Sequence, residues 1–209
     1  MSLKRLYNRF LKETASIDLS FDAPYPNVRP FDQSCKMPHK YSHEMCVVRL
    51  HDAWARFCRE LIFLCAACEP TTISGVVVAR APGVSDRSDV LPALLASYPA
   101  GKPPWWEPRW GDPGECLDAA QRLNVSNYSR LSSGLSISPS PVDDLRFIRN
   151  FFAHRSEKAA RKVHPIATSY GFARLTPALT IVETVIPPGV PIFKKWINDL
   201  DIMASQACT

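Results

Sequence analysis

Prolines set the strongest limit on how this chain can fold. The 209 residues include 19 prolines, about twice the usual ~5% share. Proline breaks the interior of a helix but is tolerated in its first turn and in connecting segments. The long windows without proline are residues 1–23, 39–69, 114–138, 142–164 and 192–209. We therefore expect helices within these windows, joined by stiff, extended connections.

The spacing of apolar residues agrees with this layout. Over residues 44–68, apolar side chains recur at steps of three and four, which is the spacing of a buried helical face. Ser42 is the expected N-cap of that helix. Shorter helices are expected after Asp89 and over residues 113–123, and an amphipathic helix over residues 190–206.

The stretch 179–186 departs from this pattern. It is rich in β-branched residues and lies between prolines, which predicts a strand or an extended arm. Because 209 residues suit one domain of ordinary size, we predict a single all-α domain over residues 1–209. Its parts are an antiparallel helical bundle with a core of about 40–165, a Pro/Trp-rich insert of about 97–113, and a C-terminal arm and helix over 166–209.

Composition narrows the class of protein. A chain with 46% hydrophobic and 22% charged residues is globular rather than disordered. No apolar run reaches the ~18–20 residues of a membrane-spanning helix, and the first ten residues alternate charged and apolar side chains, unlike a signal peptide. Seven cysteines without such a signal favour reduced thiols over disulfides. We expect a soluble, cytoplasmic protein with no membrane partner.

The positive charge of the chain is concentrated in one predicted helix, residues 142–164. Its apolar residues form an ordinary buried stripe, while Asn150 and His154, four residues apart, lie on the opposite side. Because this helix presents Asn150 and His154 on the side away from its buried stripe, we expect that side to contact a ligand or another part of a protein. The basic residues of this helix include Arg146, Arg155, Lys158, Arg161 and Lys162.

The sequence Arg149-Asn150-Phe151-Phe152-Ala153-His154 resembles the Arg-Asn-x-x-x-His form of the motif that marks HEPN domains (higher eukaryotes and prokaryotes nucleotide-binding). These domains are helical bundles, often dimeric, and many are metal-independent endoribonucleases that act as toxins or anti-phage effectors. The resemblance implies a HEPN-like bundle and a homodimer that binds RNA. The residues then expected to contact RNA are the five basic residues Arg146, Arg155, Lys158, Arg161 and Lys162. The resemblance also implies an antitoxin or immunity partner, no cofactor and no metal.

The resemblance implies that Arg149, Asn150 and His154 are catalytic, and their chemistry suits these roles. Cleavage of RNA by its own 2′-OH needs proton transfer near neutral pH, which histidine provides. It also needs a fixed cation over the phosphate oxygens, which arginine provides. Asn150 would orient the histidine or contact the phosphate. Because Arg149 and His154 diverge by about 140° around a helix, two copies facing each other would form the site.

Two alternatives remain open for these residues. Arg149 could pair with an acid such as Asp52 while His154 is an ordinary surface histidine. The domain could also be catalytically inactive and hold RNA or a nucleotide without cutting it. One departure from the family matters as well. Some HEPN toxins carry a tyrosine two residues after the histidine, where it is adenylylated, but this chain has Ser156 there.

Other patterns have weaker functional interpretations. His43 or Glu44 could reach a catalytic groove from the start of the 44–68 helix. The pair Cys65 and Cys68 spells C-x-x-C, but it ends an apolar helix, so buried thiols are the stronger interpretation. Three further groups each have one functional interpretation beside a structural one. A metal ion could be bound by Cys35, His39, His43 and Cys46, and bases could stack on Trp105, Trp106 and Trp110. An RNA groove could be lined by Arg49, Asp52, Arg56 and Arg59.

Overall fold

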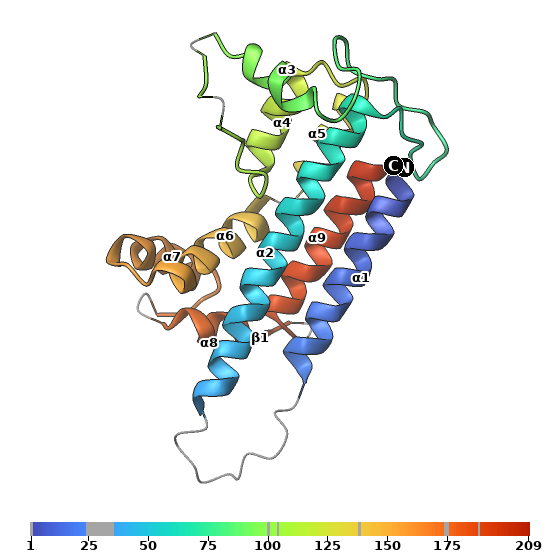
Figure 1. The fold of residues 1–209 in the computed structure, drawn as a ribbon. Coiled ribbons are helices and arrows are strands. Elements are labelled where there is room, and N and C mark those ends of the chain that lie inside the picture. The colour runs from blue at the N-terminus through green and yellow to red at the C-terminus, as the bar shows by residue number, and fades with distance from the viewer. Residues whose placement is uncertain are drawn as a thin grey trace. The chain divides into compact units, whose positions relative to one another are not determined.

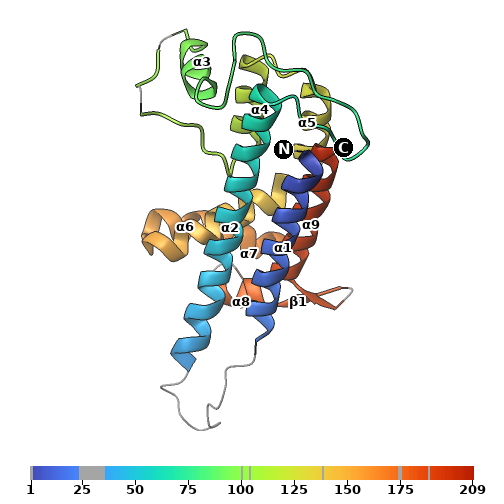
Figure 2. The same ribbon diagram turned by 45° about the vertical axis from the view of Figure 1, so that its right-hand side comes forward.

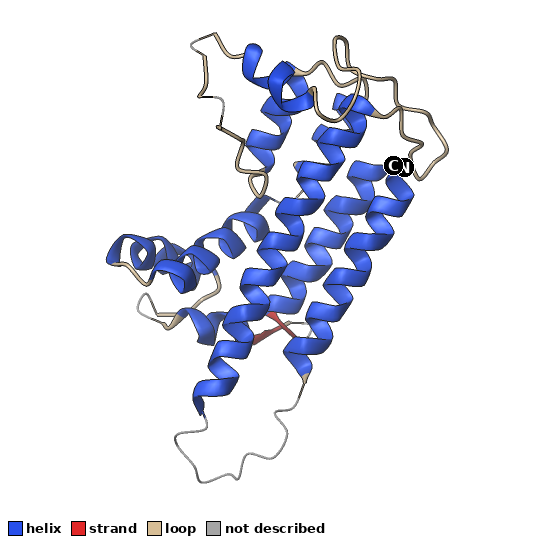
Figure 3. Ribbon diagram, in the orientation of Figure 1, coloured by secondary structure: helices blue, strands red, loops and turns tan. Residues whose placement is uncertain are grey.

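The structure is a computed structural model, and it is mostly helical (Figures 1 and 3). It describes residues 2–23, 36–99, 101–103, 105–137, 139–173, 176–187 and 189–209, with the backbone alone at 36–41 and 139. The helices are α1 (Leu3–Asp22), α2 (Lys36–Ala67), α3 (Val90–Ala96), α4 (Pro113–Arg122), α5 (Tyr128–Leu135), α6 (Pro139–His154), α7 (Glu157–Ser169), α8 (Ala178–Glu183) and α9 (Ile192–Cys208). The all-α prediction is confirmed at this level.

The chain divides into two compact units. The first comprises residues 1–12, 53–139 and 200–209, and the second comprises residues 13–52 and 140–199. The boundaries fall inside α1, α2, α6 and α9, so each of these helices supplies residues to both units, although α6 gives only Pro139 to the first. A single domain over the whole chain stays a prediction.

The first unit has an aromatic and apolar core. The ring of Phe10 packs against Trp54 and Phe57, with centroids 6.0 and 4.9 Å away. Both ends of the chain lie in this unit, close together in both views (Figures 1 and 2). They are joined through one loop, because Leu3 N donates to the Thr71 carbonyl and Ile73 N donates to the Cys208 carbonyl.

The second unit contains the segment on which the functional predictions fall. Within this unit α6, α7 and α8 gather on one side of the first half of α2 (Figures 1 and 2). Its core includes Phe193 and Trp196 of α9, both fully buried, and the Phe21 ring stacks on Phe193 at 4.4 Å. A short antiparallel hairpin pairs β1 (Val185–Ile186) with β2 (Val190–Pro191).

The expected start of the long helix is wrong. Helix α2 begins at Lys36, well before Ser42, and it includes Pro38. Proline is accepted there because the N–H groups of a first helical turn have no partner within the helix. The expected shorter helices are confirmed as α3 and α4, and the expected C-terminal helix is confirmed as α9.

The predicted strand over 179–186 is also wrong for most of its length. Residues Ala178–Glu183 form α8, and only Val185–Ile186 is a strand. Pro177, in an extended conformation, is the N-cap residue, and Ala178, Ile181 and Val182 of α8 are all buried. Their spacing suits a helical face, so packing prevails over the β propensity of the side chains.

Candidate functional site

The predicted helix over 142–164 is two helices. Helix α6 ends at His154, Arg155 takes a left-handed backbone conformation with φ of +45°, and α7 begins at Glu157. Ser156 caps α7, since its side chain accepts a hydrogen bond from the Ala159 N–H, and Glu157 lies in the first turn. Ser156 and Glu157 are a recognisable helix-start signal. The motif and the basic residues after it therefore lie on different helices.

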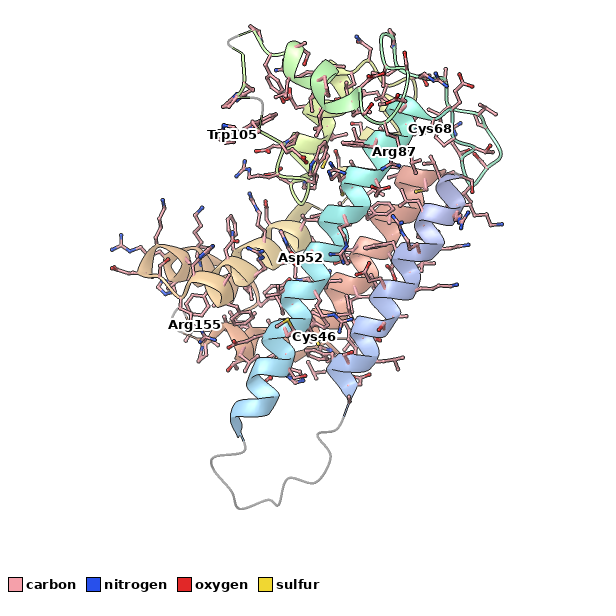
Figure 4. All side chains as sticks on the ribbon, in the orientation of Figure 1. Cys46, Asp52, Cys68, Arg87, Trp105 and Arg155 are labelled. Atoms are coloured by element: carbon pink, nitrogen blue, oxygen red, sulfur yellow. The ribbon has the colours of Figure 1, made fainter. Side chains whose placement is uncertain are left out.

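Arg149 faces α2 and is partly buried. Its Nη2 lies 3.7 Å from Asp52 Oδ1, and its Nη1 donates to Asn150 Oδ1 at 3.3 Å. The side chain is 28% exposed, and its Nε is buried with no hydrogen-bond partner among the described residues. Asp52 lies on α2, within the second unit (Figure 4). The guanidinium is thus held in a fixed place with some N–H capacity unused.

His154 is placed differently. It is the last residue of α6, it is exposed, and no described residue forms a hydrogen bond or ion pair with its imidazole. A single copy of the chain therefore brings Arg149 and Asn150 together, but it does not turn His154 toward them.

A second histidine lies beside Arg149, and the sequence patterns did not single it out. His51 Nδ1 is 3.4 Å from Asp52 Oδ1, and its side chain is mostly buried. Burial lowers the pKa of His51, and the positive charges of Arg149 and Arg146 lower it further, against the opposing effect of Asp52. The imidazole is therefore neutral at pH 7. The signal that could have found it is the adjacency of His51 to Asp52, which was already a candidate partner of Arg149.

The five predicted RNA-binding residues have different surroundings. Arg146 donates to Asp143 at 2.5 Å, and its guanidinium and the Lys162 ammonium both lie near the Phe147 ring, at 4.8 and 5.0 Å. Phe147 thus brings one cation of α6 and one of α7 together. Lys158 is exposed on α7.

Like Arg146, two more of these five residues are paired with acids. Arg161 pairs with Glu157 at 2.6 Å, and both side chains are largely exposed. Arg155 donates to Glu44 Oε2 at 2.5 Å (Figure 4). Of the five, Arg155 therefore has its charge most fully compensated, because Glu44 is buried.

The remaining candidates are mostly structural. His43 is bound at both ring nitrogens, to Glu183 Oε1 at 2.6 Å and to the Phe21 carbonyl at 3.1 Å. Burial raises the pKa of Cys65 to about 12, so its thiol is not ionised at pH 7. Cys35 and the His39 side chain lie outside the described residues, and within the described part no cluster of His, Cys, Asp or Glu side chains could hold a metal ion.

The tryptophans of the insert divide between two surroundings. Trp110 is buried, its Nε1 donates to Glu107 at 2.8 Å, and its ring meets Phe63 edge-on. Trp106 meets the Tyr98 ring edge-on at 5.0 Å. Trp105 is 81% exposed (Figure 4). The structural interpretation therefore fits Trp110, while the ring of Trp105 is exposed.

The predicted polar stripe of α2 is held by partners. Arg49 Nη1 lies 3.5 Å from Ser20 Oγ, and Asp52 pairs with Arg149. In the first unit, Arg59 Nε donates to Glu107 at 3.1 Å and the guanidinium lies 4.2 Å from the centre of the Phe63 ring. These contacts favour the structural interpretation of the stripe.

In comparisons with known proteins, no family model, no curated protein and no solved structure matches this chain. A relation to HEPN domains therefore rests on the six residues of the motif and on their helical surroundings. No helix in the described part of the chain is both long enough and apolar enough to cross a membrane.

Proposed function

We propose that this protein is a metal-independent endoribonuclease with a HEPN-like bundle and an active site shared by two copies of the chain. The observation that supports this most is the placement of the motif on α6. Arg149 is anchored by Asp52 beside Asn150, whereas His154 is exposed at the end of the same helix with its imidazole unpaired among the described residues. An exposed, unpaired imidazole is accessible to a ligand and can act toward it as a general acid or base.

The proposed reaction is attack of an RNA 2′-OH on the adjacent phosphorus. The O2′–P bond forms and the P–O5′ bond breaks, which leaves a 2′,3′-cyclic phosphate and a free 5′-OH. His154 either accepts the proton that leaves the 2′-OH or donates the proton that the 5′-oxygen needs. Arg149 contacts the crowded phosphate oxygens, where a fixed cation stabilises the developing negative charge. Asn150 forms a hydrogen bond with the same oxygens.

A homodimer is part of the proposal because Arg149 and His154 face different surroundings within one copy. A two-fold axis that places two α6 helices face to face would bring His154 of one copy to Arg149 of the other, and such an interface uses the same patch twice. Lys158 and Lys162 on α7 would then contact the RNA backbone on either side. A toxin or anti-phage role with an antitoxin or immunity partner is the setting that the motif implies.

One observation favours a second candidate. The ion pair between Arg149 and Asp52 and the partial burial of Arg149 also suit a structural arginine. In that case the chain would be a catalytically inactive module that binds RNA or a nucleotide. This candidate predicts RNA binding without any change in RNA length.

The experiment that tests the proposal is incubation of purified protein with a defined single-stranded RNA in excess EDTA, followed by analysis of the product ends. We expect cleavage that survives EDTA and leaves 2′,3′-cyclic phosphates. Cleavage that EDTA abolishes and magnesium restores, with 5′-phosphate products, would overturn the mechanism. Intact RNA that is nevertheless bound would favour the second candidate.

A further inference from the structure

A pocket lies beside the end of α6, entirely within the second unit. Its volume is about 370 Å³, within the range typical of small-molecule sites. Aromatic and aliphatic side chains form most of its walls, and its polar lining residues are Glu44 of α2, His164 of α7, Arg155, Thr176 and Thr180. The apolar walls include Phe151 and Phe152 of α6, Val163 of α7, and Ala178 and Leu179 of α8.

The polar groups of this pocket are incompletely paired. Glu44 is only 6% exposed, and although its Oε2 accepts a hydrogen bond from Arg155, its Oε1 is buried with no partner among the described residues. His164 Nδ1 is buried and unpaired in the same way. Buried polar atoms almost always have a hydrogen-bond partner, because an unsatisfied one is costly. Glu44 and His164 both line the pocket, so a ligand bound there lies next to two residues with unsatisfied polar atoms.

The chemistry of these groups narrows the class of ligand. A carboxylate oxygen accepts hydrogen bonds only, so the ligand must present N–H or O–H donors to Glu44. Arg155, next to Glu44, has a side chain that is 49% exposed. Its guanidinium has more N–H donors than the bond to Glu44 uses, so we infer that the ligand also carries hydrogen-bond acceptors. The rings of Phe151 and Phe152 suit a flat, aromatic ligand. The ligand is therefore planar, with donors and acceptors on neighbouring edges.

Guanine fits this combination better than the other bases. Its Watson–Crick edge carries two adjacent donors, N1–H and the 2-amino group, which complement a carboxylate. Its O6 and N7 are acceptors that arginine commonly contacts. Adenine and cytosine each present an acceptor next to their single amino donor, and that acceptor would face the carboxylate. Uracil presents a single N–H between two carbonyl acceptors, so a carbonyl would face the carboxylate there as well.

We propose that this pocket binds a guanine base of single-stranded RNA, with Glu44 accepting from the Watson–Crick edge and Arg155 donating to the O6 side. The inference rests on the proposed function, since a base held beside Arg155 would place its phosphate near His154, the preceding residue. Cleavage would then occur next to guanines. Recognition of a splayed-out base by stacking and by its Watson–Crick edge is common in single-stranded RNA binding.

The test is a comparison of GMP, IMP and AMP binding by calorimetry, because the three share one phosphate and differ in the base. We expect GMP to bind at least about tenfold more tightly than AMP, with IMP, which lacks the 2-amino group, in between. A short RNA with a single guanine should show the same preference over its adenine counterpart. Equal affinity for GMP and AMP, or no binding of either, would overturn the inference.

Variants make the test specific to Glu44. Glu44→Gln should remove the preference for GMP, whereas Glu157→Gln is a matched control because it breaks an exposed Glu–Arg pair outside the pocket. If Glu44→Gln fails to fold, Leu179→Trp fills the pocket and leaves the Glu44–Arg155 pair in place, and it should abolish GMP binding. A preference for GMP that survives both substitutions would contradict the inference.

The result can be separated from the outcome for the proposed function. Nucleotide binding is measured on His154→Ala protein as well, where cleavage is not expected and the pocket is unchanged. GMP preference without cleavage by the native chain would contradict the ribonuclease proposal alone. Cleavage that shows no preference for guanine and is unaffected by Glu44→Gln would contradict the pocket inference alone.

Discussion

Asp144 shows how one partly buried carboxyl group affects the second unit. The Tyr170 hydroxyl donates to Asp144 Oδ2 at 3.1 Å, and Trp196 Nε1 donates to the Tyr170 oxygen at 3.1 Å. Burial raises the pKa of Asp144 to about 6, and the charge of Asp143 adds to this effect. The folded protein therefore holds a proton on Asp144 that the unfolded chain releases near pH 4.

This proton makes the free energy of unfolding depend on pH, with a sign that follows from the raised pKa. A raised pKa contributes stability at low pH, and this contribution is lost as the pH rises from about 4 through 6. Asp144→Asn keeps an acceptor for Tyr170 and carries no charge. We expect it to raise the free energy of unfolding by about 1–2 kcal/mol at pH 7.5 and to change it little at pH 4, after allowance for partial solvent exposure.

Urea unfolding followed by tryptophan fluorescence at the two pH values checks this expectation. Asp143→Asn is the control, because Asp143 is on the same helical turn, is about half exposed and pairs with Arg146. It should not give the gain at pH 7.5. Equal effects of Asp144→Asn at both pH values would contradict the assignment of the proton to Asp144.

At the scale of elements, helix α5 approaches α9 closely in the first unit at Gly134. A Cβ atom built on Gly134 would lie 2.6 Å from Ala207 Cα, on the backbone of α9. Backbone atoms cannot move aside as a flexible side chain can. The packing of α5 on α9 therefore requires glycine at this position.

Gly134→Ala is expected to destabilise the protein by about 1–3 kcal/mol, because it forces two helices apart. In an unpacked helix the same substitution would stabilise by about 1 kcal/mol, so the sign of the effect is informative. Ser133→Ala, at the exposed neighbouring position, is the control and should be nearly neutral. Thermal unfolding of the three proteins gives the answer, and a Gly134→Ala protein more stable than native would contradict the close approach.

The sequence predicts several helices correctly because the effects of proline and of apolar spacing are local. Helices α3, α4 and α9 follow from those two signals. The break between α6 and α7 was missed, although Ser156 and Glu157 mark it, because the charge pattern continues across the break. Helix α8 was missed because its β-branched residues favour a strand locally, and only their burial in the folded unit selects a helix.

The candidate site was predictable only in part for the same reason. The motif residues and the possible pairing of Arg149 with Asp52 follow from the sequence. The neighbourhood of His51 and the pocket around Glu44 depend on which faces of α2, α6, α7 and α8 meet. The contacts that α2 makes with Arg149 and Arg155 join residues more than 90 positions apart, and periodicity along the chain does not predict such contacts.

At the scale of the whole molecule, the proposal requires two copies. We expect sedimentation velocity at micromolar concentration to show a dimer. Asn150→Arg should convert it to a monomer, since the new charge would meet its own symmetry mate. Lys158→Ala, which changes a charge on α7, should leave the dimer intact. A native protein that is monomeric with and without RNA would contradict a site shared by two copies.

The most direct measurement of the central claim is the cleavage rate and RNA affinity of His154→Ala protein, beside native protein and Lys158→Ala. If His154 transfers the proton, its loss should slow cleavage by ~10²–10⁴-fold and leave RNA affinity nearly unchanged, because no phosphate contact is removed. Lys158→Ala should instead weaken binding and flatten its dependence on salt. A folded His154→Ala protein that cuts RNA at the native rate would show that the histidine is structural and that the motif is a coincidence.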